Sequence, residues 1–319
     1  MMAKYCSRKC IVSLYSKFSA LYVIVALIAF YTTYIVFDYV HTQTYEWQCT
    51  YLAEKVTPVS RQSCSLPVIP PSSDGSKKKP KIAMLMMYDN ADGNWNKDLM
   101  ERVLDNRNAY AKQYGYTVIN ANDLIDKSRP AAWSKLIAME THLASNKFDY
   151  ILYIDMDVII MNPSIQLESF IVPGKDLTMT QDWNGLNSGV WLAKNSEWTR
   201  WFLHTAWEQK QLVQKKSPEG ISYPFEYEQR AFHFLTNSDI WQQRHLPHYR
   251  GDIEDIKSHI FTLPQCALNS YVLHPLDYRG SREESQYVEG DFLVHFAGKK
   301  GQMKTDLMEH YLREVEESN

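Results

Sequence analysis

The chain has 319 residues, 45% of them hydrophobic, which is enough to build the core of one large domain or two small ones. Its 34 lysines and arginines stand against 37 aspartates and glutamates, for a formal net charge of -3. This balance supplies no basic field that would attract a polyanion, which argues against nucleic acid as a partner.

Residues 18–37 carry no charged side chain, and as a helix they are long enough to cross the ~30 Å hydrocarbon core of a membrane. The preceding residues 1–17 contain cations and no acid, which predicts a cytosolic N-terminus and type II topology. A cleaved signal peptide is the alternative, but the apolar run is longer than usual for one and no A-x-A-like site closes it. We therefore expect one transmembrane helix at 18–37.

Residues 38–79 are rich in Pro, Ser and Lys towards their end, a composition that does not form a packed core. We expect a stalk here and a single lumenal catalytic domain at 80–319. In an oxidising compartment Cys49 and Cys64 are candidates for a disulfide, with unpaired thiols as the equal alternative.

Apolar runs alternate with amphipathic stretches along the first part of this domain, as in an α/β fold with a Rossmann-like nucleotide-binding half. The expected strands are 82–87, 116–119 and 149–161, and the expected helices are 99–114 and 133–145. Further on, we expect two strands joined by a turn around Asn184 and Gly185, and a helix capped by Ser196. A short helix in EYEQRAFHFL, a strand in DFLVHFAG and an amphipathic C-terminal helix complete the expectation.

Asp155 and Asp157 follow the apolar run ILYI and are two residues apart, so in an extended segment they project from the same face. Carboxylate oxygens of this kind suit Mg²⁺ or Mn²⁺ bridging a diphosphate. A lone D-x-D pair has an equal alternative as a surface or capping feature. The preceding strand favours the metal.

Two other classes of protein also fit this pattern. Haloacid-dehalogenase-like phosphatases place a D-x-D after a hydrophobic strand, but usually after the first strand of the fold, whereas two strands precede it here. A catalytically silent, lectin-like membrane protein is the third reading.

Five motifs then follow one another in order, and their combination resembles glycosyltransferase family 34 over about residues 81–300. The motifs are AWSKL, YIDMDVIIMNP, DWNGLNSGVWLAKNSEW, EQRAF and VHFAGK. The family includes fungal α-1,2-galactosyltransferases, subunits of the yeast α-1,6-mannan polymerase and plant xyloglucan xylosyltransferases. The resemblance implies a GT-A fold, retention of anomeric configuration, Mn²⁺ (or Mg²⁺) dependence and a place in the Golgi membrane.

The resemblance also implies a set of metal ligands and of groups that bind the nucleotide-sugar. The metal ligands are Asp155, Asp157 and His295. The expected cofactor-binding residues are Asp89 for the base or ribose, Lys135 and Lys299 for the diphosphate, and Asn184 for the donor sugar.

Asp182, Asn187 and Gln229 are the candidate catalytic residues, with Glu228 as a further choice beside Gln229. The motif N-G-L-N-S-G favours galactose from UDP-galactose as the donor sugar, with mannose from GDP-mannose as the alternative. A glycan acceptor is expected, and since some family members work in complexes, so is a homo- or hetero-complex.

Overall fold

The computed structural model describes residues 28–33, 64, 79–89, 96–182, 185–213, 227–237, 249, 251–272 and 285–318. The chain divides into two units, Met1–Thr57 and Pro58–Asn319. In the first unit, residues 28–33 are helical, and the hydroxyls of Thr32 and Thr33 donate to carbonyls one turn earlier in the helix.

The prediction of a transmembrane helix at 18–37 has to be corrected. Among the described residues, no helix is both long enough and apolar enough to cross a membrane. Of the predicted span, the structure describes the helical residues 28–33, and the rest of it lies outside the described part of the chain.

The second unit is built on a six-stranded sheet and a smaller three-stranded one, which confirms the α/β class. The large sheet has the strand order β2-β1-β3-β6-β5-β7, and all of its strands are parallel except β6. Its strands are β1 (Ile82–Met86), β2 (Thr117–Asn120), β3 (Tyr150–Ile154), β5 (Leu177–Asp182), β6 (Gly185–Lys194) and β7 (Ile260–Leu263). The small sheet has the order β4-β9-β8, formed by β4 (Val158–Ile160), β9 (Leu293–His295) and β8 (Ser270–Tyr271).

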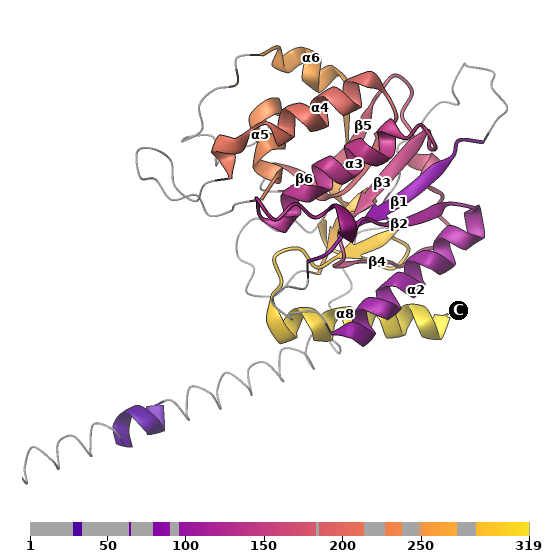
Figure 1. Ribbon diagram of the computed structural model, residues 1–319. Helices are drawn as coiled ribbons and strands as arrows, with labels where there is room; N and C mark the ends of the chain where they lie inside the picture. Colours follow the sequence, from indigo (N-terminus) through magenta and orange to yellow (C-terminus); the bar gives the residue numbers. More distant parts are fainter. Residues whose placement is uncertain are drawn as a thin grey trace, which may run out of the picture. The chain divides into compact units, whose positions relative to one another are not determined.

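Helices cover both faces of the large sheet (Figure 1). On one face lie α3 (Ser134–Ala144), α4 (Glu197–Trp207), α5 (Gln229–Thr236) and α6 (Ile253–Ser258). On the other lie α2 (Lys97–Tyr114) and α8 (Gly301–Ser318), side by side and joined by an ion pair between Arg102 and Glu316. The short helix α7 (Gln265–Leu268) leads into β8.

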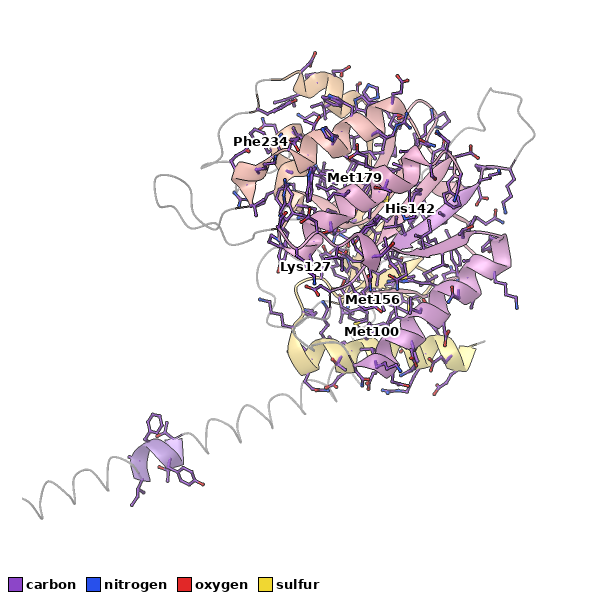
Figure 2. The ribbon with its side chains drawn as sticks, viewed as in Figure 1. Met100, Lys127, His142, Met156, Met179 and Phe234 are labelled. Atoms are coloured by element: carbon purple, nitrogen blue, oxygen red, sulfur yellow. A yellow bond between two sulfur atoms is a disulfide. The ribbon has the colours of Figure 1, made fainter. Side chains whose placement is uncertain are left out.

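The core lies between the sheet and α3, α4 and α5, where side chains fill the space (Figure 2). β1 is a continuous run of buried residues because both of its faces are covered, as its apolar sequence predicted. Met179, labelled in Figure 2, comes from β5 and is fully buried in this core.

Several predicted elements are confirmed at their ends as well as in their type. Helix α2 ends at Gly115, whose φ of 77° is the left-handed conformation that glycine adopts most readily. Helix α4 begins after Ser196, whose side chain accepts a hydrogen bond from the amide of Thr199.

One predicted strand is wrong in an informative way. The run 149–161 is not one strand but two, because β3 ends at Ile154 and β4 begins at Val158 in the other sheet. Asp155, Met156 and Asp157 form the turn between them, which we call the D-x-D turn.

The predicted Cys49–Cys64 pair is also wrong, because Cys64 forms a disulfide with Cys266 in α7, 202 residues along the chain. The backbone amide of Cys64 also donates to the buried carboxylate of Asp291. Cys64, which was expected to lie in the stalk, is thus covalently bonded to α7 of the second unit. Cys49 lies outside the described residues.

Candidate functional site

The D-x-D turn lies where the chain passes from the large sheet to the small one. The amide of Asp155 donates to the carbonyl of Gly189 in β6 at 2.8 Å, so Asp155 is held by the large sheet. The carbonyl of Asp157 accepts from the amide of Phe296, just after β9, at 2.9 Å, so Asp157 is held by the small sheet.

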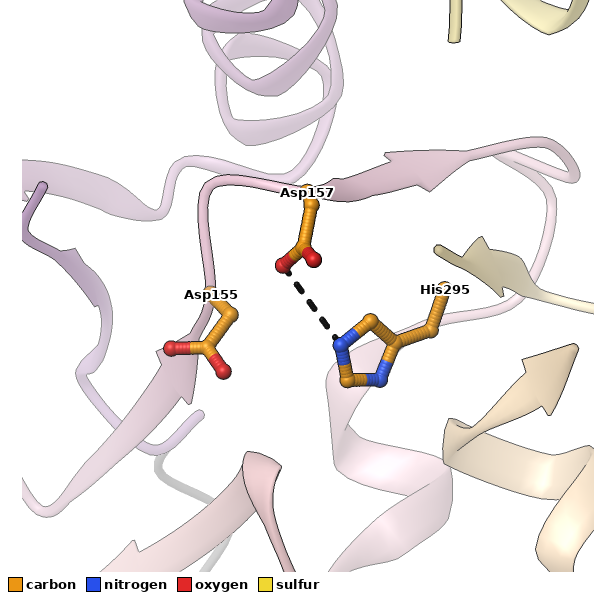
Figure 3. Close-up of side chains that lie close together, drawn as sticks. All are labelled: Asp155, Asp157 and His295. Carbon is orange, nitrogen blue, oxygen red and sulfur yellow. Dashed lines mark ion pairs between the residues drawn. The ribbon is translucent and has the colours of Figure 1, made fainter. Parts of the chain in front are cut away.

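Asp155, Asp157 and His295 come together at this turn (Figure 3). Each offers one ligand atom, and these atoms all lie within 4.8 Å of one another. The Nε2 atom of His295 is 3.5 Å from Asp157 Oδ1, and β4 and β9 set this approach by pairing Val158 with His295. The structure therefore brings together the three residues predicted to bind a metal.

The surroundings of these side chains suit a divalent cation. Two carboxylates with one imidazole form an oxygen and nitrogen ligand set of the kind that Mn²⁺ or Mg²⁺ accepts. Burial by itself would raise the pKa of Asp157, but the positive charge of Lys304 and the nearby ring of His295 outweigh it and hold that pKa well below its usual range. Asp157 is therefore a carboxylate at neutral pH and available as a ligand.

Close approach of the backbone is required at Gly189, opposite the turn. A Cβ at this position would lie 2.4 Å from His295 Cε1, 2.9 Å from Asp155 Oδ2 and 3.0 Å from Asn187 Oδ1. Glycine in β6 thus leaves the room that the ligand side chains occupy.

Lys135, predicted to neutralise a diphosphate, is buried at the start of α3 with its ammonium group among protein oxygens. Its Nζ lies 3.1 Å from Asp155 Oδ1 and 2.8 Å from Glu228 Oε1, and it donates to the carbonyl of Ser188. Burial would lower the pKa of Lys135, but Asp155 and Glu228 outweigh it and raise that pKa well above its usual value. These contacts make Lys135 a support for Asp155; its contact with a diphosphate stays a prediction.

Lys304, from the first turn of α8, was not singled out in the sequence. Its Nζ lies 2.5 Å from Asp157 Oδ2, so each ligand carboxylate faces one lysine, Lys135 or Lys304. Lys299, predicted for the diphosphate, is partly exposed in the segment between His295 and α8, where its amide donates to the carbonyl of Phe296. In the sequence, only the proximity of Lys304 to the histidine motif VHFAGK could have indicated a role for Lys304.

Arg107 is a second residue that the sequence did not reveal. It is fully buried in α2 and donates to the carbonyl of Asp155 at 2.5 Å and to that of Val158 at 3.2 Å. Burial lowers the pKa of Arg107 to about 10, which leaves the guanidinium charged at neutral pH. Arg107 thus supplies donors to two backbone carbonyls around the D-x-D turn, and a buried arginine in a helix carries no sequence signal of its own.

Asp182 and Asn187, two of the candidate catalytic residues, lie on the paired strands β5 and β6 and contact each other. Asn187 Nδ2 donates to Asp182 Oδ2 at 3.0 Å and to the hydroxyl of Tyr271 at 2.9 Å. The tyrosine hydroxyl in turn donates to Asp182 Oδ2 at 2.6 Å. Tyr271, which the sequence did not single out, is therefore part of this group.

Gln229, the third catalytic candidate, begins α5, and its Oε1 accepts from the amide and hydroxyl of Ser188 at 3.3 and 3.2 Å. Asp89 is exposed just beyond the carboxyl end of β1, the strand that pairs in parallel with β3. Asp89 therefore lies at the same edge of the sheet as Asp155. Asn184 lies outside the described residues.

A parallel α/β half that ends in a D-x-D turn, with a histidine from a second sheet beside the two carboxylates, is the arrangement that the resemblance to a glycosyltransferase predicted. The comparison with known families agrees, since residues 78–178 and 173–305 match the model of the galactosyl transferase GMA12/MNN10 family. This match extends over well over half of the chain, and the chain belongs to that family. The predicted glycosyltransferase family is confirmed, and the haloacid-dehalogenase-like alternative is set aside.

The sequence identities between the chain and individual members of this family are low. The chain is 27% identical to the "Probable alpha-1,6-mannosyltransferase MNN10" of Saccharomyces cerevisiae, over 61% of this chain and 54% of the relative. It is 24% identical to the "Probable alpha-1,2-galactosyltransferase gmh1" of Schizosaccharomyces pombe, over 69% of each. The chain thus spans about half the length of the first relative.

Among solved structures, a glycosyltransferase involved in the glycosylation of the major capsid of PBCV-1 is similar with a TM-score of 0.48 and 14% identity. The similarity covers 73% of this chain and 98% of that one.

Proposed function

We propose that this chain is a retaining, Mn²⁺-dependent glycosyltransferase that moves a hexose from a nucleotide-sugar onto a glycan acceptor in the Golgi. The observation that carries the proposal is the cluster of Asp155, Asp157 and His295, whose ligand atoms lie within 4.8 Å of one another at the carboxyl end of β3. Ligands of open α/β sheets bind beyond the carboxyl ends of the strands, which is the edge where this cluster lies.

A cation held by these three residues would supply Lewis-acid stabilisation of the negative charge on the departing nucleoside diphosphate. The protein has two tasks around it. Lys135 and Arg107 fix the side chain and the carbonyl of Asp155, and the small sheet fixes Asp157 beside His295. Preorganised groups of this kind lower the cost of reaching the transition state because they need no rearrangement during the reaction.

Asp182, Asn187 and Gln229 are proposed to hold the donor sugar. Asp182 and Asn187 are hydrogen-bonded to each other, and both Asn187 and Gln229 are attached to the segment of β6 that includes Ser188 and Gly189. Since Gly189 also approaches Asp155 and His295, the sugar-binding candidates and the metal ligands share one wall of the site. In a retaining reaction the acceptor attacks from the face of the leaving group, so both must be held on this side.

Galactose from UDP-galactose is our first proposal for the donor, and mannose from GDP-mannose is the second. The relatives support both, since one is described as a galactosyltransferase and another as a mannosyltransferase. The Cys64–Cys266 disulfide supports a place in the oxidising secretory pathway, because disulfides are rare in proteins of the cytosol. Work in a homo- or hetero-complex stays a prediction.

The proposal is tested by donor hydrolysis with UDP-galactose, UDP-xylose, UDP-glucose and GDP-mannose, each with and without Mn²⁺. We expect one donor to be hydrolysed in a Mn²⁺-dependent way and Asp157→Asn to abolish this reaction while the thermal midpoint of the chain stays close to its original value. Mn²⁺-dependent hydrolysis by Asp157→Asn at the original rate would contradict the metal site. Release of phosphate from a simple phosphomonoester, without hydrolysis of any nucleotide-sugar, would contradict the enzyme class.

A further inference from the structure

A chain of hydrogen bonds links the sugar-binding candidate Asp182 to the metal-ligand candidate His295 through two residues that have no role so far. Tyr271 Oη donates to Asp182 Oδ2 at 2.6 Å, and Asn269 Nδ2 donates to Tyr271 Oη at 3.0 Å. At the other end of the same amide, Asn269 Oδ1 lies 2.6 Å from His295 Nδ1. Asn269 is fully buried, and His295 is only 4% exposed.

The direction of each hydrogen bond in this chain is fixed by the chemistry of its members. The hydroxyl of Tyr271 has a single hydrogen, and it is donated to Asp182 Oδ2 at 2.6 Å. The oxygen of Tyr271 therefore accepts from Asn269, and the amide nitrogen of Asn269 must face Tyr271.

With its nitrogen towards Tyr271, Asn269 presents its amide oxygen to His295. This oxygen cannot donate, so the hydrogen between Asn269 and His295 belongs to Nδ1 of the histidine. In the neutral imidazole, Nε2 then carries a lone pair, and Nε2 is the atom that lies 3.5 Å from Asp157 Oδ1.

The backbone holds this arrangement in place. Asn269 directly precedes β8, which pairs in parallel with β9, so that Tyr271 lies opposite His295. The amide of Asn269 donates to the carbonyl of Gln265, the first residue of α7. Cys266 in α7 is bonded to Cys64, which fastens the segment that carries Asn269.

We infer that Asn269, oriented by Tyr271 and Asp182, is a positioning residue that fixes the tautomer and the ring orientation of His295 for metal binding. The inference rests on the proposed metal site. Groups that hold the second nitrogen of a metal-binding histidine typically contribute roughly 10- to 100-fold to metal affinity. The inference also makes Asp182 act at both ends of the site, on the sugar side directly and on the metal side through Tyr271 and the buried Asn269.

The test is a titration of the full chain with Mn²⁺ alone, followed by the electron paramagnetic resonance of free Mn²⁺. Asn269→Leu removes the acceptor for His295 Nδ1 and should weaken binding roughly 10- to 100-fold. Asn269→Asp keeps an acceptor oxygen for Nδ1 but loses the donor to Tyr271, so it should weaken binding less than Asn269→Leu does. Asn195→Leu is the matched control, because Asn195 also donates to a partly buried backbone carbonyl but lies just past the opposite end of β6.

The readout separates this inference from the proposed function. Equal Mn²⁺ affinity for Asn269→Leu and the unaltered chain would overturn the inference alone, as would an equal loss in Asn269→Leu and Asn269→Asp. Absence of Mn²⁺ binding by the unaltered chain would overturn the proposed metal site together with the inference. Should Asn269→Leu fail to fold, Asn269→Ala removes the same acceptor without adding bulk and takes its place in the comparison.

Discussion

Gly189 is the position at which one added methyl group tests the geometry of the whole site. A Cβ there would lie 2.4 Å from His295 Cε1, whereas ordinary van der Waals contact begins at 3.4 Å. The imidazole would have to move by the difference, 3.4 − 2.4 = 1.0 Å, and Asp155 and Asn187 are also closer than such contact allows. Misplacement of a catalytic group by about 1 Å costs on the order of 100-fold in rate.

We therefore expect Gly189→Ala to lower the rate of donor hydrolysis by on the order of 100-fold and to weaken Mn²⁺ binding. The added methyl group overpacks the site and should lower the free energy of unfolding by about 1–3 kcal/mol. The assays are Mn²⁺ titration, donor hydrolysis and urea unfolding. Gly115→Ala is the control, because its φ of 77° makes alanine unfavourable there while its Cβ would meet nothing within 4 Å. If Gly189→Ala bound Mn²⁺ and hydrolysed the donor like the unaltered chain, the close approach at β6 would be refuted.

Three further variants test the supports of the site by urea unfolding. Lys135→Met leaves the buried carboxylate of Glu228 without its cationic partner and should lower the free energy of unfolding by about 3–5 kcal/mol. A decrease below about 1 kcal/mol, as for an ion pair on the surface, would contradict this role of Lys135. Arg107→Met removes the donor to two carbonyls around the D-x-D turn and should lower the free energy of unfolding by about 1–3 kcal/mol. Its control, Arg102→Met in the same helix, breaks a partly exposed ion pair and should lower that free energy by at most about 1 kcal/mol. Cys64→Ser opens a long covalent loop and should cost about 2–5 kcal/mol, a difference that disappears when both chains are unfolded under reducing conditions.

Local sequence was enough to predict most of the elements of the domain. Helix α2 could be predicted to its last residue because Gly115 supplies a left-handed cap, and β1 because a strand buried on both faces is apolar throughout. These signals depend on neighbours in the sequence, and neither requires knowledge of what packs against the element.

The interpretation of residues 149–161 as one strand failed because the apolar run is continuous while the backbone is not. Every residue of β3 after Tyr150 and every residue of β4 is buried, so hydrophobicity gave no sign of the change of sheet. At this break the carbonyls of Asp155 and Val158 accept from Arg107 in α2, which is a tertiary contact. A residue some 50 positions earlier in the chain cannot be matched to its acceptors from sequence alone.

The partners of the predicted site residues were hidden for the same reason. Lys135 was predicted to neutralise a diphosphate, yet two carboxylates from separate elements surround its ammonium group. For Cys64 the sequence offered a bond to Cys49 or an unpaired thiol, whereas its partner is Cys266 in α7. In each case the motif identified a residue of the site, while its role depends on contacts formed only by the fold.

The change of sheet within the D-x-D turn gives the two carboxylates independent supports. A straight strand would fix the spacing of Asp155 and Asp157 by its pleat alone. Here Asp155 is attached to Gly189 in the large sheet, while Asp157 is attached to the small sheet beside His295, so the distance between Asp157 and His295 is set separately from the position of Asp155. A cation bound by all three would join the two sheets, so changes that shift the small sheet should weaken metal binding while leaving the large sheet in place.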